Sequence, residues 1–219
     1  MRPFGPPRKV LCSIGAGSHT ELLKLTSPSF AAYANRHGYD LDLRTELLVP
    51  DRPASSSKIR LLQELLGRYD LVMWVDADAA IVDASQDIAE PLGSQLIAMV
   101  AHVTPEGDHI PNAGVLVVRS HRSVRAFLGA VWEQKQFIEH KWWENAAWLT
   151  LLGYELEPTV RLVKPTRMYY RTAFLSNEWN SVPGDSAERP RIIHCAGQDH
   201  VTRLRVLGSI FRDSIAEGE

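Results

Sequence analysis

The chain has 219 residues, of which 45% are hydrophobic and 23% are charged, as is typical of a soluble globular protein. Its length fits one domain over residues 1–219, and its net charge of -2 argues against a nucleic-acid partner. No apolar run reaches the ~20 residues of a transmembrane helix, and no signal-peptide core follows residues 1–8. We therefore expect a cytoplasmic protein with a flexible tail at residues 1–8, and the oligomeric state stays open.

Strand and helix signals alternate along the first third of the chain. In order, we predict a strand at 9–14, helices at 20–25 and 30–37, a strand at 39–47, a helix at 58–66 and a strand at 71–75. Ser27 and Pro28 favour the start of the second helix, because serine is a frequent N-cap and proline fits the first helical position. The third helix places Ile59, Leu62 and Leu65 on one face, which predicts packing against the sheet.

The alternation continues through the rest of the chain. Strands are predicted at 95–103 and 115–118, helices at 123–138 and 142–152, short strands at 161–163 and 191–195, and a helix at 201–215. This pattern predicts a single α/β domain with a mostly parallel sheet, in which ligands bind at the carboxyl ends of strands. The two cysteines, Cys12 and Cys195, lie in strand-like runs and are expected to be reduced core thiols.

Two carboxylates follow the apolar strand at 71–75. Asp76 and Asp78 are one residue apart, so they would point to the same face of an extended backbone and supply the oxygen ligands that Mg²⁺ or Mn²⁺ prefers. The triplet by itself is equally compatible with a capping pair or a pair that faces water. The apolar residues on both sides favour the metal, because a buried charge needs a partner.

A histidine far along the chain is a third candidate ligand. His194 follows two isoleucines near the end of the strand at 191–195, where a histidine is more often a hydrogen-bonded core residue than a ligand. Gly197 comes soon after, and a glycine lets the backbone approach a phosphate. If the two parts of the chain meet, Asp76, Asp78 and His194 would form a divalent metal site with open positions.

Two polar segments are further candidates. Asn112 belongs either to a turn or to a strand edge from which its amide reaches sugar hydroxyls. Glu144 and Asn145 suit the dipole of the helix that they open, and they would equally suit the polar rim of a pocket. The preceding Trp142 and Trp143 fit either the core or stacking on a sugar ring.

Taken in order, these residues resemble glycosyltransferase family 34, the galactomannan galactosyltransferases and xyloglucan xylosyltransferases. The resemblance covers about residues 9–200. Its motifs are His37-Gly38-Tyr39-Asp40, then Lys58 with Leu61-Leu62 leading into Trp74-Val75-Asp76-Ala77-Asp78-Ala79, then Asn112-Ala113-Gly114-Val115 with Arg119, and finally Pro190-Arg191-Ile192-Ile193-His194 with Gly197.

The resemblance implies a glycosyltransferase-A fold, a nucleotide-sugar donor that is usually UDP-linked, Mn²⁺ (or Mg²⁺), and retention of the anomeric configuration. It implies that the metal is held by Asp76, Asp78 and His194. In the donor site it places Lys58 near the phosphates, Asn112 at the donor sugar and Gly197 at the diphosphate. The other donor-site residues are Ile14, Gly15, Ala16 and Ser18 after the first strand, and Ala77 between the two carboxylates.

The start of the helix at 142–152 departs from the family, which has an Asp-Gln pair where this chain has Glu144 and Asn145. The change alters the reach of both side chains, so the donor sugar stays open, as does the acceptor, whether a saccharide, a glycolipid or a glycosylated small molecule. Glu144, Asn145 and Asn112 are the expected catalytic residues, lining the anomeric centre while an acceptor hydroxyl attacks. The missing Golgi-type anchor suggests a bacterial version.

Three other functions compete with this one. In a haloacid-dehalogenase-type phosphatase, Asp76 would be the nucleophile and Asp78 the acid–base, but Ala80 stands where that family prefers threonine. A sugar nucleotidyltransferase would carry basic residues in the loop at 14–18, which has none. A non-catalytic module would bind the sugar nucleotide without turning it over.

Overall fold

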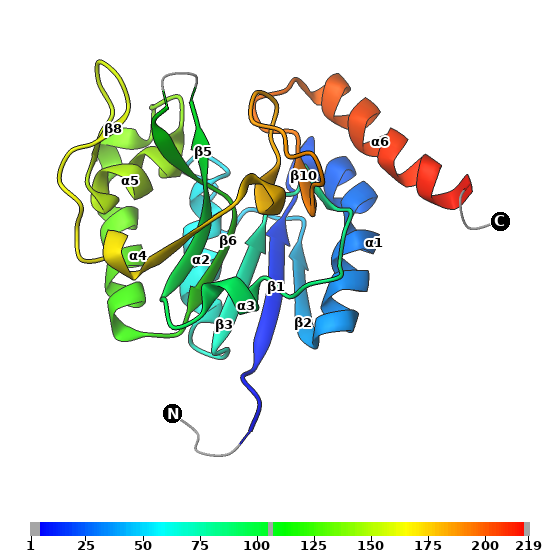
Figure 1. The fold of residues 1–219 in the computed structure, drawn as a ribbon, viewed down its shortest axis with the longest axis horizontal. Helices are drawn as coiled ribbons and strands as arrows, with labels where there is room; N and C mark the ends of the chain where they lie inside the picture. The colour runs from blue at the N-terminus through cyan, green and yellow to red at the C-terminus, as the bar shows by residue number, and fades with distance from the viewer. Residues whose placement is uncertain (1–4, 105–106, 217–219) are drawn as a thin grey trace.

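A mixed six-stranded sheet forms the centre of the protein in the computed structural model, which describes residues 5–104 and 107–216 (Figure 1). In spatial order the strands are β2 (Tyr39–Arg44), β1 (Lys9–Ile14), β3 (Leu71–Val75), β6 (His109–Arg119), β5 (Ile97–Val103) and β9 (Thr172–Leu175). β1 pairs in parallel with β2 and β3, as does β5 with β9, whereas β6 is antiparallel to both of its neighbours. The prediction of an α/β fold with a mostly parallel sheet is therefore confirmed.

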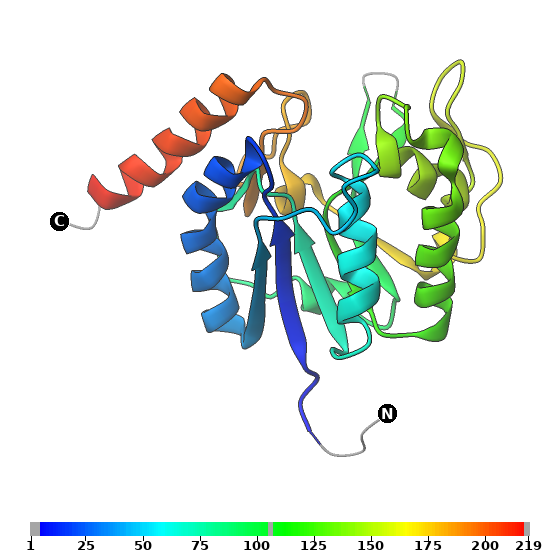
Figure 2. The same cartoon turned by 180° about the vertical axis from the view of Figure 1, so that it is seen from behind.

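Helices cover both faces of this sheet (Figures 1 and 2). The helices α2 (Ser56–Leu65), α4 (Arg122–Glu133) and α5 (Trp143–Leu152) pack on one face, and α1 (His19–His37) and the short α3 (Ala89–Leu92) pack on the other. Every residue of β3 is buried, and its side chains alternate between the two cores. A strand that is buried on both faces reads as a continuous apolar run, which explains why β3 was predictable from the sequence.

The two helices predicted at 20–25 and 30–37 are one helix, and the prediction of a break between them is wrong. α1 runs from His19 to His37 with Pro28 inside it, and it ends at Gly38 with φ of 67°. Proline has no N–H for the carbonyl four residues earlier, which is that of Lys24. The hydroxyl of Ser27 donates to this carbonyl at 3.2 Å. The helix therefore continues, because the residues before and after Pro28 bury the same face against the sheet.

Replacing Pro28 by alanine should raise the free energy of unfolding by about 1 kcal/mol, because the new N–H bonds the carbonyl of Lys24 inside a helix that already has the right geometry. Urea denaturation would measure the gain. In the Pro28→Ala background, Ser27→Ala should cost less than it does in the wild-type background, since its acceptor then has a backbone donor. Equal costs in the two backgrounds would contradict this account of the helix.

Several predicted boundaries shift, and some elements were not predicted. The second strand ends at Arg44 rather than at residue 47, and the strand predicted at 115–118 is the end of the longer β6. The helix predicted at 123–138 ends at Glu133 and is followed by a 3₁₀ turn, Lys135–Phe137. The unpredicted elements are α3, β9, β4 (Ala79–Ile81), β7 (Tyr154–Glu155), and the 3₁₀ turns η2 (Tyr169–Arg171) and η3 (Asn177–Asn180).

The last part of the chain forms elements outside the central sheet. β10 (Ile192–His194) pairs with β4, β8 (Arg161–Leu162) pairs with β7, and α6 (His200–Ala216) packs against α1. Both cysteines are buried and free, as expected, and burial raises the pKa of Cys195 to about 11. Of the predicted tail, residues 5–8 are exposed and residues 1–4 lie outside the described part of the chain. Among the described helices, none combines the length and apolarity needed to cross a membrane.

Candidate metal centre

A tight turn at the end of β3 presents the two predicted carboxylates. The N–H of Asp76 donates to the carbonyl of Gly114 on β6, and the N–H of Ala79 donates to the carbonyl of Asp76. The chain then continues as β4, so Asp76 and Asp78 lie within one turn between two strands. The indole Nε1 of Trp74 donates to Oδ1 of Asp76 at 2.6 Å, which fixes the direction of that carboxylate.

The pairing of β4 with β10 brings His194 to the same place. His194 lies opposite Ala79 in this pair, and the N–H of Cys195 donates to the carbonyl of Asp78. His194 Nε2 is 3.3 Å from Oδ1 of Asp78 and 3.6 Å from Oδ2 of Asp76. One ligand atom from each of the three residues falls within 4.8 Å of the others. The two distant parts of the chain therefore meet as the sequence predicted, and the donor set suits a divalent cation.

The ionisable side chains of this cluster shift one another's pKa. Burial would raise the pKa of Asp78, but His194 and then Arg203 outweigh it and hold that pKa well below its usual range. Burial would lower the pKa of His194, but Asp78 and then Asp76 outweigh it, so that pKa is raised. The Nε of Arg203, on α6, lies 3.1 Å from Oδ2 of Asp78. The carboxylate of Asp78 thus remains ionised and attracts positive charge, which a metal ion would supply.

Lys58 is buried behind the carboxylates. Its Nζ contacts the carbonyl of Ala113 at 2.9 Å, Oε1 of Glu144 at 2.8 Å and Oδ1 of Asp76 at 3.2 Å. Burial favours the neutral amine, but Asp76 and Glu144 outweigh it and raise the pKa of Lys58. Lys58, on α2, therefore links β6, α5 and the turn after β3, because a single ammonium group contacts a residue of each. The position near donor phosphates that was predicted for it stays a prediction.

The amide of Asn145 completes the irregular part of β6. Its Oδ1 accepts from the N–H of Ala113 at 2.9 Å, and its Nδ2 donates to the carbonyl of Pro111 at 3.3 Å. The side chain therefore bonds the backbone as a neighbouring strand would, at the level where β5 and β6 shift register. Asn112, between these two residues, accepts from the N–H of Gly114 at 2.7 Å through its own Oδ1.

The segment after β1 that was predicted to belong to the donor site lies at the same edge of the sheet. Gly15 is buried, its N–H donates to the carbonyl of Arg44, and its carbonyl accepts from Thr20. A Cβ at Gly15 would lie 2.4 Å from Cβ of Leu23, so only glycine fits. Residues 14, 16 and 18 extend outward from this point, being half-buried or exposed. The carbonyl of Ala77 points toward α1 and accepts a hydrogen bond from the hydroxyl of Thr26.

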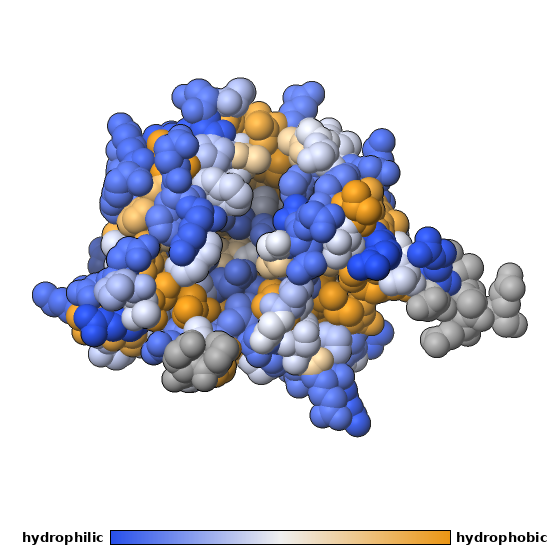
Figure 3. Space-filling model, turned by 90° about the horizontal axis from the view of Figure 1, so that it is seen from above, coloured by the Kyte–Doolittle hydropathy of each residue, from blue (hydrophilic) through white to orange (hydrophobic). Residues whose placement is uncertain are grey.

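Gly197 lies in the loop between β10 and α6, with a positive φ of 72° that favours glycine. The structure thus places it just past His194, although its predicted contact with a diphosphate stays a prediction. The face seen from above is hollowed near its centre and bordered mostly by hydrophilic residues (Figure 3). That view looks onto the end of the molecule where β1 and β3 finish (Figure 1).

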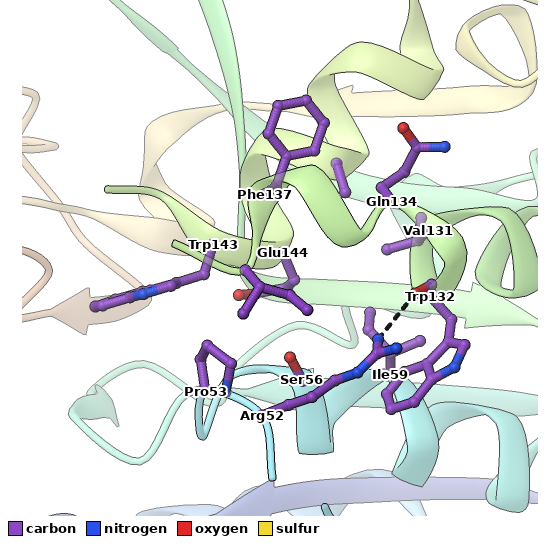
Figure 4. Close-up of a pocket in the computed structure, with 12 residues that line it drawn as sticks. Arg52, Pro53, Ser56, Ile59, Val131, Trp132, Gln134, Phe137, Trp143 and Glu144 are labelled. Carbon is purple, nitrogen blue, oxygen red and sulfur yellow. Dashed lines mark hydrogen bonds between the residues drawn. The ribbon is translucent and has the colours of Figure 1, made fainter. Parts of the chain in front are cut away.

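A small cavity adjoins Glu144 on the side of α2 and α4 (Figure 4). Its volume of about 20 Å³ has room for roughly one water molecule, so a sugar ring does not fit in it. Arg52, which lines the cavity, and Arg60 both stack on Trp132, with Cζ 3.6 and 3.7 Å from the centroid of its ring. Trp143 is half-exposed, has a positive φ of 42°, and extends away from the other residues drawn.

Three residues at the site were given no role of their own from the sequence. Asn180, on η3, is fully buried, and its Oδ1 lies 2.9 Å from Nδ1 of His194. Arg203 neutralises part of the charge of Asp78. Gly114 leaves space for the imidazole, since a Cβ there would lie 2.3 Å from Cε1 of His194. Gly114 belonged to a predicted motif, whereas the sequence around Asn180 and Arg203 carries no motif that would have singled them out.

No protein-family model matches the sequence, and no curated protein matches it. The fold is similar to a glycosyltransferase involved in the glycosylation of the major capsid of PBCV-1, with a TM-score of 0.70 and 15% identity over 93% of this chain and 100% of that one. It is similar to the galactosyltransferase LgtC in complex with donor and acceptor sugar analogues, with a TM-score of 0.59 and 11% identity over 91% and 95% of the two chains.

A third similar structure is the glycosyltransferase GlyE of Streptococcus pneumoniae, with a TM-score of 0.59 and 12% identity over 96% of this chain and 65% of that one. At sequence identities this low, the structural similarity establishes the fold alone and says nothing of the reaction. The chain therefore has the glycosyltransferase-A fold that the sequence resemblance implied.

Proposed function

We propose that the protein is a metal-dependent glycosyltransferase that moves a sugar from a nucleotide-sugar donor, of the UDP-linked type, to a hydroxyl of an acceptor. The observation that carries the proposal is the cluster of Asp76, Asp78 and His194, whose ligand atoms lie within 4.8 Å of one another. The cluster follows a buried central strand, in a fold shared with three glycosyltransferases. Ligands of α/β sheets bind at such strand ends.

The residues at this place fit Mn²⁺ or Mg²⁺. Two carboxylates supply oxygen ligands, and the imidazole supplies nitrogen, a combination that Mn²⁺ accepts readily. Asp76 is 27% exposed, so a ligand has access from its side, whereas Asp78 and His194 are buried. When bound, such an ion would neutralise the diphosphate of the donor and stabilise the charge that develops on the departing phosphate.

The remaining side chains would orient the sugar. Asn112 uses its Oδ1 within the protein, and in the described part of the chain its Nδ2 has no hydrogen-bond partner, so it is free to donate to a hydroxyl of the donor. Glu144 is paired with Lys58 at 2.8 Å, which disperses its charge and makes it a poor covalent nucleophile. Glu144 would therefore line the anomeric centre and stabilise positive charge there.

Retention of configuration is part of the proposal and rests on the resemblance to family 34. The acceptor hydroxyl would attack from the face that the phosphate leaves. The donor sugar, the acceptor class and the assignment to that family are likewise proposals, for which the order of motifs from His37-Gly38 to Gly197 is the support. Analysis of the anomeric configuration of the product would test the stereochemical part.

A thermal-shift screen of UDP-, GDP- and TDP-sugars, each with and without Mn²⁺, tests the donor class. A UDP-sugar with Mn²⁺ present at 100 times its dissociation constant should add about 2.7 kcal/mol to the stability. For a chain of this length that corresponds to a rise of about 5–10 °C in Tm. The gain should vanish without the metal.

A lack of any shift with every sugar nucleotide would overturn the donor assignment. Release of phosphate from a simple phosphoester would instead support a phosphatase, and consumption of UTP with a sugar phosphate would support a nucleotidyltransferase. Tight UDP binding without transfer or hydrolysis would support a binding module. Each outcome separates one of these functions from the proposed one.

A further inference from the structure

A chain of hydrogen bonds leads from the backbone of β6 to the imidazole of His194. The N–H of Gly114 donates to Oδ1 of Asn112 at 2.7 Å, and the same oxygen accepts from Nδ2 of Asn180 at 2.9 Å. The Oδ1 of Asn180 in turn lies 2.9 Å from Nδ1 of His194. Asn180 and His194 are both buried, so solvent does not compete for these bonds.

The direction of each bond follows from the first one. A backbone N–H can only donate, so the atom of Asn112 that faces it must be the carbonyl oxygen. That oxygen can only accept, so Asn180 must turn its amino group toward it. The oxygen of Asn180 then faces His194, and Nδ1 of His194 must carry a proton to complete the contact. In the neutral ring this leaves the lone pair on Nε2, which is the atom that faces Asp76 and Asp78.

A second anchor sets the same orientation of Asn180. His102 Nδ1 lies 2.9 Å from the carboxylate of Asp185, which accepts hydrogen bonds and so holds the proton of a neutral imidazole on Nδ1. Burial lowers the pKa of His102 and outweighs the opposing effect of Asp185. Its Nε2 is then an acceptor, and it lies 3.5 Å from Nδ2 of Asn180. Both neighbours of the amino group of Asn180 are acceptors, so a flipped amide would face two repulsive contacts.

We propose that Asn180 is a positioning residue that holds the neutral His194 in the tautomer with Nε2 free, and so prepares this nitrogen to bind the divalent metal. The inference rests on the proposed metal site. A partner on the far ring nitrogen is a general means of orienting a metal-bound histidine. Gly114 has two parts in the arrangement, because it donates the first hydrogen bond and leaves room for the ring.

The test compares Asn180→Ala with Asn180→Asp. Alanine removes the acceptor for Nδ1, so both tautomers should be populated and Mn²⁺ affinity should fall by roughly 10–100-fold. Aspartate still accepts from Nδ1, so it should keep the tautomer, but its second oxygen faces the acceptors Asn112 Oδ1 and His102 Nε2, so Mn²⁺ affinity should lie between those of the alanine variant and the wild type. Glu178→Gln, in the same 3₁₀ turn but with an exposed carboxylate, is the matched control and should leave both properties unchanged.

Two measurements give the result. Nitrogen-15 NMR of the metal-free protein, recorded at a pH high enough to deprotonate His194 despite its raised pKa, reports the tautomer, and the signal of His194 among the 8 histidines is assigned by its loss in His194→Gln. Electron paramagnetic resonance of free Mn²⁺ gives the dissociation constant without any turnover. Should Asn180→Ala fail to fold, Asn112→Ala takes its place: it should raise the population of the other tautomer, whereas Asn112→Asp should not.

Wild-type tautomer and affinity in Asn180→Ala would overturn the inference, as would loss of the proton from Nδ1 of the neutral His194 in Asn180→Asp. If the wild-type protein bound no Mn²⁺ at all, the proposed metal-dependent function would fail. The NMR measurement would still decide whether Asn180 sets the tautomer of His194, so the two failures can be told apart.

Discussion

Replacing Asp76 and Asp78 together by asparagine should abolish Mn²⁺ binding and reduce glycosyl transfer by on the order of a thousandfold, because a bound metal supplies several kcal/mol of transition-state stabilisation. The substitutions keep the shape of both side chains but remove two of the three ligands. Turnover of the donor identified in the thermal-shift screen would measure the activity. Titration calorimetry with Mn²⁺ would measure the binding.

Asp83→Asn is a suitable control for this pair. Asp83 follows the far end of β4, is 43% exposed at its side chain and pairs with Arg191 rather than with the site. The control should therefore retain activity and Mn²⁺ affinity near those of the wild type. A folded Asp76→Asn, Asp78→Asn protein with near wild-type turnover would refute the metal-dependent mechanism, and the glycosyltransferase assignment would then need another basis.

Replacing Lys58 by methionine should lower the free energy of unfolding by about 3–5 kcal/mol, since it leaves buried charges without their partner. The lysine side chain is 4% exposed and that of Glu144 is 10% exposed, so water compensates little. Adding Glu144→Gln should recover part of the loss, because one of the two unpaired carboxylates is then gone. Urea denaturation of the two single variants and the double variant would give the coupling between them.

Lys9→Met provides the comparison for this prediction. Lys9 pairs with Asp87 at 2.7 Å near the start of β1, at the opposite end of the strand from the metal site. Asp87 keeps hydrogen bonds from Tyr39 and Ala89 when the lysine is removed, so the loss should be smaller. Equal stability of Lys58→Met and wild type would show that the buried cation is not needed to hold Asp76 and Glu144 together.

Much of the fold was predictable because the element that each segment favours by its own sequence is also the one in which it packs in the folded protein. β3 is a continuous apolar run and β1 a mainly apolar one, both become buried strands, and α2 presents one apolar face to them. The two carboxylates were predictable for the same reason, since their position after a buried strand is a local feature. α1 shows the opposite case, because a local rule for Pro28 yields to packing of the whole helix against the sheet.

β6 was predicted too short because its first half contains Pro111, Asn112 and Gly114, which are typical of turns. The strand persists there because the side chain of Asn145 bonds the backbone on both sides of Asn112. Such support comes from a helix that follows much later in the sequence. The same is true of Asn180, whose partners His194 and Asn112 lie 14 and 68 residues from it along the chain, so no spacing rule reveals it.

The pairing of β10 with β4 has a consequence for how the protein is assembled. The last strand of the central sheet, β9, ends at Leu175, so every strand of that sheet precedes β10 along the chain. A chain that ended at Leu175 would contain every strand of the scaffold but would lack Asn180, His194 and Arg203. The scaffold and the site are therefore completed by different parts of the chain, and loss of the pairing between β10 and β4 would take His194 away from the two carboxylates without removing a strand from the central sheet.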